Sequence, residues 1–278
     1  MTDRVGVRKT YKLYLGGEFP RSESGRTYEA VGHDGELLAH AVRASRKDVR
    51  DAVVAARKAF PSWAGKTAYN RGQILYRIAE MMETRRLELI EEVHRAEGAG
   101  PEDQVERAID CWVYYAGLAD KLAQITGGVN PVAGPYFNIT VPEPIGVTGI
   151  AAPARPSVLG LVARLAPALC AGNTVVVLAS EPHPLPAITV AECLATSDVP
   201  KGVVNVLTGL PAELLPVLAG HLDVDAIDLT GVTGEASIEA ETLAADNVKQ
   251  VIRGGQEPSP YEAAAFTEMK TVWHPKGA

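Results

Sequence analysis

Cysteine is scarce in this chain of 278 residues, and histidine forms no recognisable pattern. An odd number of scattered cysteines without CxxC spacing excludes a disulfide framework and gives no zinc-site signature. The six histidines form no HxxxH or HExxH pair, so we predict no metal site. The scarcity of cysteine favours a reducing compartment, and we expect a cytoplasmic protein. The cysteines are Cys111, Cys170 and Cys193.

The sequence also lacks long hydrophobic runs and a marked excess of charge of one sign. No stretch approaches the roughly 18 uninterrupted apolar residues of a membrane span, and the first residues lack the apolar run of a signal peptide. The 27 basic and 34 acidic side chains are interspersed, with a net charge of −7. This pattern argues against nucleic acid or a membrane as partner. Small molecules or other proteins are the expected partners.

The first half of the chain contains a β-rich N-terminal segment followed by helices. Residues 11–45 alternate short apolar runs with Gly-Gly, Ser-Gly and Asp-Gly pairs, which is typical of β-hairpins. Between Ser45 and about Glu97 apolar residues recur at helical spacing, which predicts two amphipathic helices broken near Pro61. A third helix is predicted over residues 101–125, with aromatic residues that we expect to pack in a core.

The second half reads as a parallel sheet. The chain between Thr126 and Pro144 is rich in Gly and Pro around the extended piece Tyr136–Val141, which favours an edge hairpin or a protruding arm. Five apolar runs then alternate with helical stretches, as in successive βαβ units. The predicted fold class is therefore α/β, a Rossmann-like parallel sheet with flanking helices plus a small β arm. The runs are 146–151, 174–180, 203–208, 226–230 and 248–252, and the helices lie near 157–170, 185–197, 211–221 and 234–246.

The last twenty residues read as a linker followed by a single strand. Residues 258–265 resemble a linker, and residues 266–274 are β-prone with period-two alternation. An exposed strand is an aggregation liability unless something pairs with it. The run therefore indicates a partner. We expect that residues 266–278 can be removed without touching the core of the sheet.

The doubly wound fold alone hosts many unrelated activities, but several short sequence motifs are more specific for a family. In their order along the chain they resemble the aldehyde dehydrogenase superfamily. The motifs are KLYLGGEF at 12–19, AVVAARKAFPSW at 52–63, RAIDCWVYYAGLADKL at 107–122, EPIGVTGIAAP at 143–153, LAPALCAGNTVVV at 165–177, PKGVVNVLTG at 200–209 and FTEMKTVW at 266–273.

The resemblance implies a domain plan from which one part is missing. Residues 1–125 and 146–256 correspond to the family's discontinuous dinucleotide-binding (Rossmann) domain. Residues 126–145 and 257–278 correspond to its oligomerisation arm and C-terminal strand. Residues 251–256 resemble the family's ELGGK-like motif, and the C-terminal strand follows within ten residues of it. The catalytic domain that normally separates the two is therefore expected to be absent.

The resemblance also implies that the catalytic groups are lost. Oxidation of an aldehyde through a thioester needs a thiolate, a base and donors for an oxyanion. None of the three cysteines lies in a context that matches the family's nucleophile. Ala154 stands where the family has its oxyanion-stabilising Asn, and Ile252 stands where it has its general-base Glu. We therefore assign no catalytic residue and no metal ligand.

Coenzyme contacts are altered as well. Leu178 replaces a Lys that contacts the adenosine ribose in the family, and Val232 replaces a Ser that contacts the pyrophosphate. We therefore expect no cofactor, or only weak binding of NAD(P). The glycines at the strand ends either cradle a phosphate or simply let strands turn into helices. If nucleotide binding is retained, the candidate cofactor-binding residues are Glu181, Gly209, Gly231 and Thr233.

Three functions follow from these observations. The first is a non-catalytic aldehyde-dehydrogenase-like subunit that assembles, through its arm and tail, with itself or with a full-length aldehyde dehydrogenase. The second is an NAD(P)-binding oxidoreductase half whose active site is completed by another chain. The third is a binder of another nucleotide or of an acyl ligand in the old coenzyme crevice.

Overall fold

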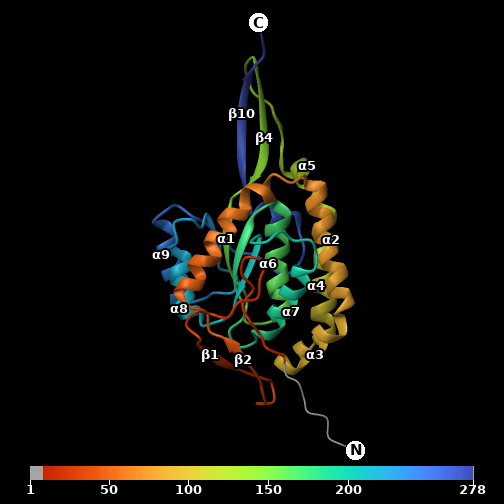
Figure 1. The fold of residues 1–278 in the computed structure, drawn as a ribbon. Coiled ribbons are helices and arrows are strands. Elements are labelled where there is room, and N and C mark those ends of the chain that lie inside the picture. The colour runs from red at the N-terminus through yellow and green to blue at the C-terminus, as the bar shows by residue number, and fades with distance from the viewer. Residues whose placement is uncertain (1–8, 278) are drawn as a thin grey trace, which may run out of the picture.

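A parallel sheet of five strands runs through the middle of the structure, a computed structural model that describes residues 9–277 (Figure 1). The strands are β5 (Val147–Ala151), β6 (Thr174–Leu178), β7 (Val204–Leu207), β8 (Ala226–Asp228) and β9 (Gln250–Ile252). Their spatial order is β7-β6-β5-β8-β9, and each neighbouring pair is parallel. Residues of the inner strands are buried on both faces, which is why these strands read as continuous apolar runs.

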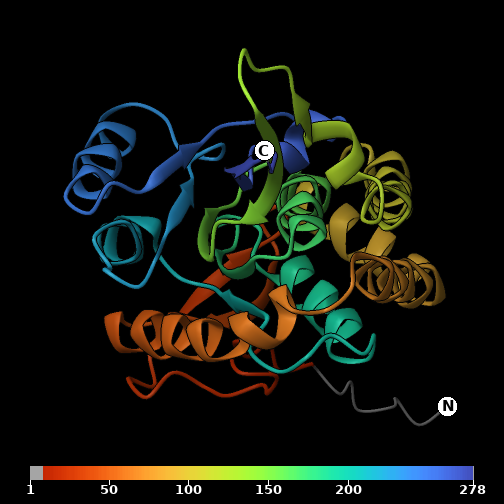
Figure 2. The same ribbon diagram turned by 90° about the horizontal axis from the view of Figure 1, so that it is seen from above.

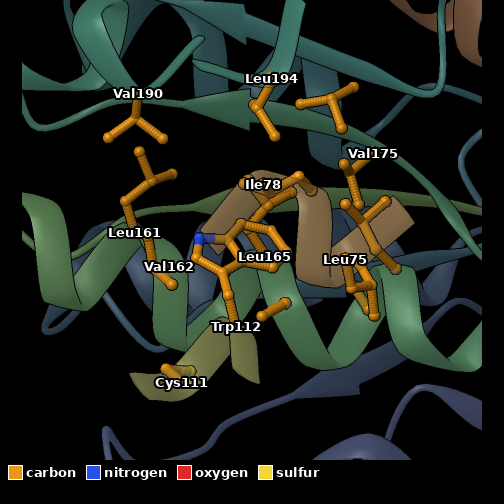
Figure 3. Close-up of a cluster of buried hydrophobic side chains, with 14 of the residues drawn as sticks. Leu75, Ile78, Cys111, Trp112, Leu161, Val162, Leu165, Val175, Val190 and Leu194 are labelled. Carbon is orange, nitrogen blue, oxygen red and sulfur yellow. The ribbon is translucent and has the colours of Figure 1, made fainter. Parts of the chain in front are cut away.

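Helices cover both faces of this sheet (Figure 2). One face packs against α1 (Arg46–Ala64), α8 (Pro211–Ala219) and α9 (Glu235–Ala245). The other packs against α6 (Ser157–Ala171) and α7 (Leu185–Ala195), and outside them lie α2 (Ala68–Thr84), α3 (Arg86–Glu97) and α4 (Pro101–Leu118). In that layer Trp112 and Ile78 lie against Leu165 of α6 (Figure 3). The predicted α/β class is confirmed.

The longer hairpin of residues 9–45 is present as predicted, with its turn at Asp34-Gly35. It is formed by β1 (Thr27–Val31) and β2 (Leu37–Val42). The preceding segment instead adds to the edge of the main sheet, where Tyr14 and Val206 exchange backbone hydrogen bonds of 2.9 and 2.7 Å. This segment also turns at Gly16-Gly17, where Leu15 and Glu18 exchange backbone hydrogen bonds of 3.0 and 3.1 Å, so the tight turn predicted there is present.

The helices between residues 46 and 126 differ from the prediction in their breaks. Pro61 lies inside α1, which continues to Ala64, so the predicted break there is wrong. Pro61 is in the last turn, where its own carbonyl accepts from the N–H of Gly65 at 3.1 Å. The predicted second helix is split at Arg85 into α2 and α3. The predicted third helix ends at Leu118, and a separate short helix, α5 (Leu122–Thr126), follows.

A long, narrow β arm projects from one end of the molecule (Figure 1). Its three strands are β3 (Gly128–Asn130), β4 (Tyr136–Pro144) and β10 (Thr267–Pro275), in the spatial order β10-β4-β3. β10 pairs with β4 along its whole length, from Thr267 opposite Pro144 to Pro275 opposite Tyr136. The terminal strand therefore finds a partner for one edge within the same chain, which corrects the inference that its pairing needs another molecule. Its other edge borders no strand of the described residues.

The segment between β9 and β10 is packed, so the prediction of a linker is wrong. It contains the short helix α10 (Pro260–Ala264), and both Ala263 and Phe266 are fully buried. The backbone N–H of Ser259 donates to the hydroxyl of Tyr115 at 3.2 Å. Because Phe266 belongs to the main core cluster, removing residues 266–278 would open that core, contrary to our expectation. We call residues 253–266 the closure.

A buried ion network fixes the closure to the sheet. Arg164 of α6 is fully buried, and its Nε donates to Asp228 at the end of β8 at 2.6 Å. A second nitrogen of Arg164 donates to Glu262 of α10 and, at 3.3 Å, to the carbonyl of Gly255. One guanidinium therefore joins α6, β8 and α10.

Among residues 9–277, no helix combines the length and apolar character needed to cross a bilayer. The same residues hold no group of three or more His, Cys, Asp or Glu side chains placed to bind a metal ion.

Candidate functional site

The candidate site lies at the carboxyl ends of the parallel strands, at the end of the sheet away from the arm. β4 runs directly into β5, so the amino end of β5 lies at the base of the arm and its carboxyl end lies at the far side. From β5 the chain builds outward through β6 and β7, then crosses to β8 and β9 on the other side. Such a reversal of strand order leaves a crevice where doubly wound proteins bind ligands.

A cleft of about 380 Å³ opens at this edge between α8 and α9. Its walls are mainly apolar, with Leu215 and Pro216 from α8 facing Ala236 and Ala240 from α9. Thr233 supplies a hydroxyl at its floor. Its charged side chains, Glu235 and Glu239, are both acidic. The cleft therefore suits a largely apolar group, and its acidic side chains disfavour a phosphate.

The structure brings two of the four candidate cofactor residues into this cleft, Gly231 and Thr233. At Gly231 a Cβ would lie 2.5 Å from the carbonyl oxygens of Ala151 and Ala152, so the backbone approach admits only glycine. Gly209 and Glu181 are not among the residues that line the cleft. Gly209 has φ +154°, and a Cβ there would lie 2.9 Å from Leu214, so packing also explains this glycine. Glu181 is exposed on the loop after β6.

The two residues that replace coenzyme contacts belong to the packed interior. Leu178 is 2% exposed and lies in the core cluster beneath α1 and α8, against which Val232 also packs. A lysine at position 178 would have to leave this cluster to reach solvent. Apolar side chains at these positions therefore match the surrounding packing.

The amino end of α6 is already occupied by an internal acid. The side chain of Glu97 accepts from the backbone N–H of Ser157 at 2.9 Å and also from its hydroxyl. Gln104 accepts from the N–H of Val158 at 2.6 Å. These bonds satisfy N–H groups that would otherwise attract a bound anion. No local pattern indicated either residue, because both come from helices that are distant from α6 in the chain.

Ala154 and its neighbour Arg155 are exposed on the loop before α6. Ala154 offers no side-chain donor. Arg155 does, and its Nε donates to Nε2 of His183 at 2.8 Å. Burial lowers the pKa of His183, which suits a neutral ring that accepts this bond. Arg155 is a polar residue of the site that the sequence analysis overlooked, although its position beside Ala154 was visible.

All three cysteines are buried in the core. Burial raises the pKa of Cys111 and Cys170 to about 12 and that of Cys193 to about 11. A reactive thiol needs a lowered pKa and access to solvent, and none of the three has either. Ile252, at the position of the family's base, is 2% exposed and also lies in the core.

The parallel sheet, its strand order and its crevice define a domain of the dinucleotide-binding class. The profile of the aldehyde dehydrogenase family matches residues 20–259, and the chain belongs to that family.

The chain spans from 29% to about half of the length of the relatives that it matches. It is 34% identical to aldehyde dehydrogenase, cytosolic 1, of Elephantulus edwardii, covering 86% of this chain and 49% of that protein. It is also 34% identical to the mitochondrial benzaldehyde dehydrogenase of Antirrhinum majus, covering 89% of this chain and 47% of that protein. The crystal structure of PnpE in complex with nicotinamide adenine dinucleotide superposes with a TM-score of 0.80 and 33% identity, over 88% of this chain and 51% of that one.

Proposed function

We propose that this chain is a non-catalytic aldehyde-dehydrogenase-like subunit, a pseudoenzyme, that assembles through its arm with itself or with a full-length aldehyde dehydrogenase. The proposal includes the domain division inferred from the sequence. Residues 1–125 and 146–256 would form the dinucleotide-binding-like domain. Residues 126–145 and 257–278 would form the arm and terminal strand. A catalytic domain would be absent.

The observation that carries the proposal is an exposed apolar face on the arm. In the register of the sheet, Ile139 lies opposite Val272 on one side and Val129 on the other. Residues two positions away along β4 point to the same face. The apolar side chains of this face are at least two-fifths exposed, and Lys270 and His274 lie beside them on β10. An exposed apolar group of this kind marks an interaction site. We call it the arm face; it consists of Val129, Phe137, Ile139, Val141 and Val272.

The opposite face of the arm has more contacts among its own side chains. The amide of Asn130 donates to the hydroxyl of Thr140 at 2.8 Å, and Thr140 hydrogen-bonds the hydroxyl of Thr271 across the strands at 2.9 Å. At the tip, the rings of Tyr136 and Trp273 pack edge to face, with their centroids 5.9 Å apart. The two faces therefore differ in what they offer a partner, and the arm face has fewer internal partners.

Two matched substitutions test the arm face. Ile139 is 41% exposed and Met269, on the opposite face, is 43% exposed. Ile139→Asp should reduce the particle mass measured by light scattering, because it places a charge in the centre of the proposed contact. Met269→Asp should leave the mass unchanged. Equal masses for both variants and the unaltered chain would contradict the assignment of this face.

The absence of catalysis is part of the proposal, because the thiols are buried and no carboxylate stands at position 252. The purified chain should not oxidise a panel of aldehydes with either NAD or NADP. Turnover that disappears on changing Cys170 or Cys193 to Ala, in variants that remain folded, would refute this part.

A second candidate is an NAD(P)-binding half-enzyme completed by another chain. It is favoured by the cleft between α8 and α9 and by the likeness to PnpE, which was crystallised with the dinucleotide. We expect weak binding at most, since Val232 offers no hydroxyl and Glu235 and Glu239 oppose phosphate. Calorimetry with NAD decides between the candidates. A dissociation constant in the low micromolar range would favour the half-enzyme, and Glu239→Gln should tighten any binding that occurs.

The cytoplasm is our proposal for the compartment, and it rests on the scarcity of cysteine. The names of the relatives include a cytosolic and a mitochondrial enzyme, so fractionation of the native cell is the appropriate test. Recovery of the chain in an organelle would overturn the proposal.

A further inference from the structure

A second hollow, separate from the crevice, lies between the start of α1 and the first turn of α8. It has a volume of about 530 Å³, and mostly charged side chains line it. α1 begins directly after β2, so the hollow lies at the end of the molecule away from the arm (Figure 1). We call it the basic cleft. Its charged residues are the cations Arg26, Arg46, Lys47 and Arg50 and the acids Glu23 and Glu213.

Two of these cations, Arg46 and Arg50, form no ion pair with the described residues. Glu213 is shared by Arg43 and by Arg26, the latter at 3.6 Å, and Lys47 pairs with Asp51. Within residues 9–277, Arg46 and Arg50 have no carboxylate oxygen within 4 Å of the guanidinium.

The placement of Arg46 and Arg50 is also unfavourable for the helix itself. Arg46 is the first residue of α1, where the helix dipole disfavours positive charge, and Arg50 is four residues further on, where like charges repel. They are not needed to cap the helix. Ser45 already accepts from the N–H groups of Lys47 and Asp48, and Asp48 completes the capping box. A local arrangement that opposes its own helix often marks a functional site.

We propose that the basic cleft binds a small ligand bearing at least two phosphate charges, held by the guanidiniums of Arg46 and Arg50. Guanidinium groups match phosphate oxygens in a bidentate geometry, and an anion between them removes their mutual repulsion. The occupant is small because acids border the cleft on both sides, at Glu23 and Glu213. A nucleic acid backbone would meet these acids and the overall negative charge.

Inorganic pyrophosphate is the probe for this site. Titration of the full chain by calorimetry at low ionic strength should detect binding, and Arg46→Gln/Arg50→Gln should weaken it by at least about tenfold. Arg77→Gln is the matched control, since Arg77 is an exposed arginine on α2, outside the cleft, and binding should be unchanged. Glu239→Gln, in the crevice between α8 and α9, should also leave pyrophosphate affinity unchanged, which separates this site from any coenzyme site.

Thermal unfolding gives a second measurement that a structural role would not reproduce. Without ligand, Arg46→Gln/Arg50→Gln should be at least as stable as the unaltered chain, because it removes charges that oppose the dipole. Pyrophosphate should raise the midpoint of the unaltered chain only. No binding by the unaltered chain, equal binding by the double variant, or a lowered midpoint of the double variant without ligand would each overturn the proposal. Tighter binding of a short oligonucleotide than of pyrophosphate would overturn the size assignment.

Discussion

Removing the cation of the buried network should destabilise the whole chain. Arg164 is fully buried between Asp228 and Glu262, and its guanidinium also lies over the ring of Phe266, 5.3 Å from the centroid. In Arg164→Met the side-chain volume is largely kept. Asp228, which is also fully buried, then loses its counter-charge and keeps only the N–H of Thr230, at 2.8 Å, as a donor.

Loss of one partner of a buried ion pair costs about 3–5 kcal/mol, because the remaining charge stays desolvated. That is a large part of the roughly 5–15 kcal/mol by which domains are stable. Urea unfolding at neutral pH should therefore show a lower midpoint for Arg164→Met. Arg164→Met/Asp228→Asn should recover part of the loss, since it removes the stranded charge. Hydrogen exchange should increase first in the closure, because Glu262 loses its anchor as well.

An Arg164→Met variant that loses less than about 1 kcal/mol of unfolding free energy would refute this prediction. It would also be refuted if neutralising Asp228 in the double variant added to the loss. Either result would mean that solvent reaches Asp228 and that the closure is held by its apolar contacts alone.

Three further predictions address the core, the tail and the effect of pH. The buried thiols should resist alkylation in the native state at neutral pH and react only on unfolding. Their pKa values in the folded chain are raised from 9.0 to about 11–12. The stability that the protonated thiols contribute is present below pH 9 and lost as the pH rises through the folded values, so alkaline unfolding should follow. Removing residues 268–278 should leave the core folded, whereas removing residues 266–278 should cost about 3–5 kcal/mol more by the loss of Phe266, a difference that urea unfolding measures. Burial raises the pKa of Glu92 above 4.5, so the stability that its protonated form contributes is present below pH 4.5 and lost as the pH rises. Glu92→Gln should therefore be more stable than the unaltered chain at pH 7 but not at pH 4. Equal stability of the two chains at pH 7 would contradict this prediction.

The sheet could be predicted from the sequence because each strand is buried by its immediate neighbours. Runs such as Thr174–Leu178 are apolar on both faces, and the helices between them have the spacing and length of crossover connections. The arm could be placed for the same local reason, since its Gly- and Pro-rich surroundings exclude a central strand.

The closure could not be predicted, because its order comes from distant residues. Ala263 and Phe266 look like ordinary members of a short alanine-rich stretch, and their burial depends on α6 and on Tyr115. The same holds for Glu97, whose carboxylate acts at the start of α6, sixty positions further along the chain. In the crevice, the sequence left open whether Gly231 serves a phosphate or the backbone, and the approach of the carbonyls of Ala151 and Ala152 is itself enough to require glycine there.

The mass of the chain in solution tests the assembly claim most directly. Sedimentation equilibrium at micromolar concentration, on the chain alone and on mixtures with a full-length aldehyde dehydrogenase, measures the species formed without labels. The arm face predicts a particle larger than the 29.5 kDa of one chain, either alone or as a mixed complex that Ile139→Asp abolishes. A chain that sediments at 29.5 kDa alone, and does not sediment with any full-length dehydrogenase, would contradict the proposed function.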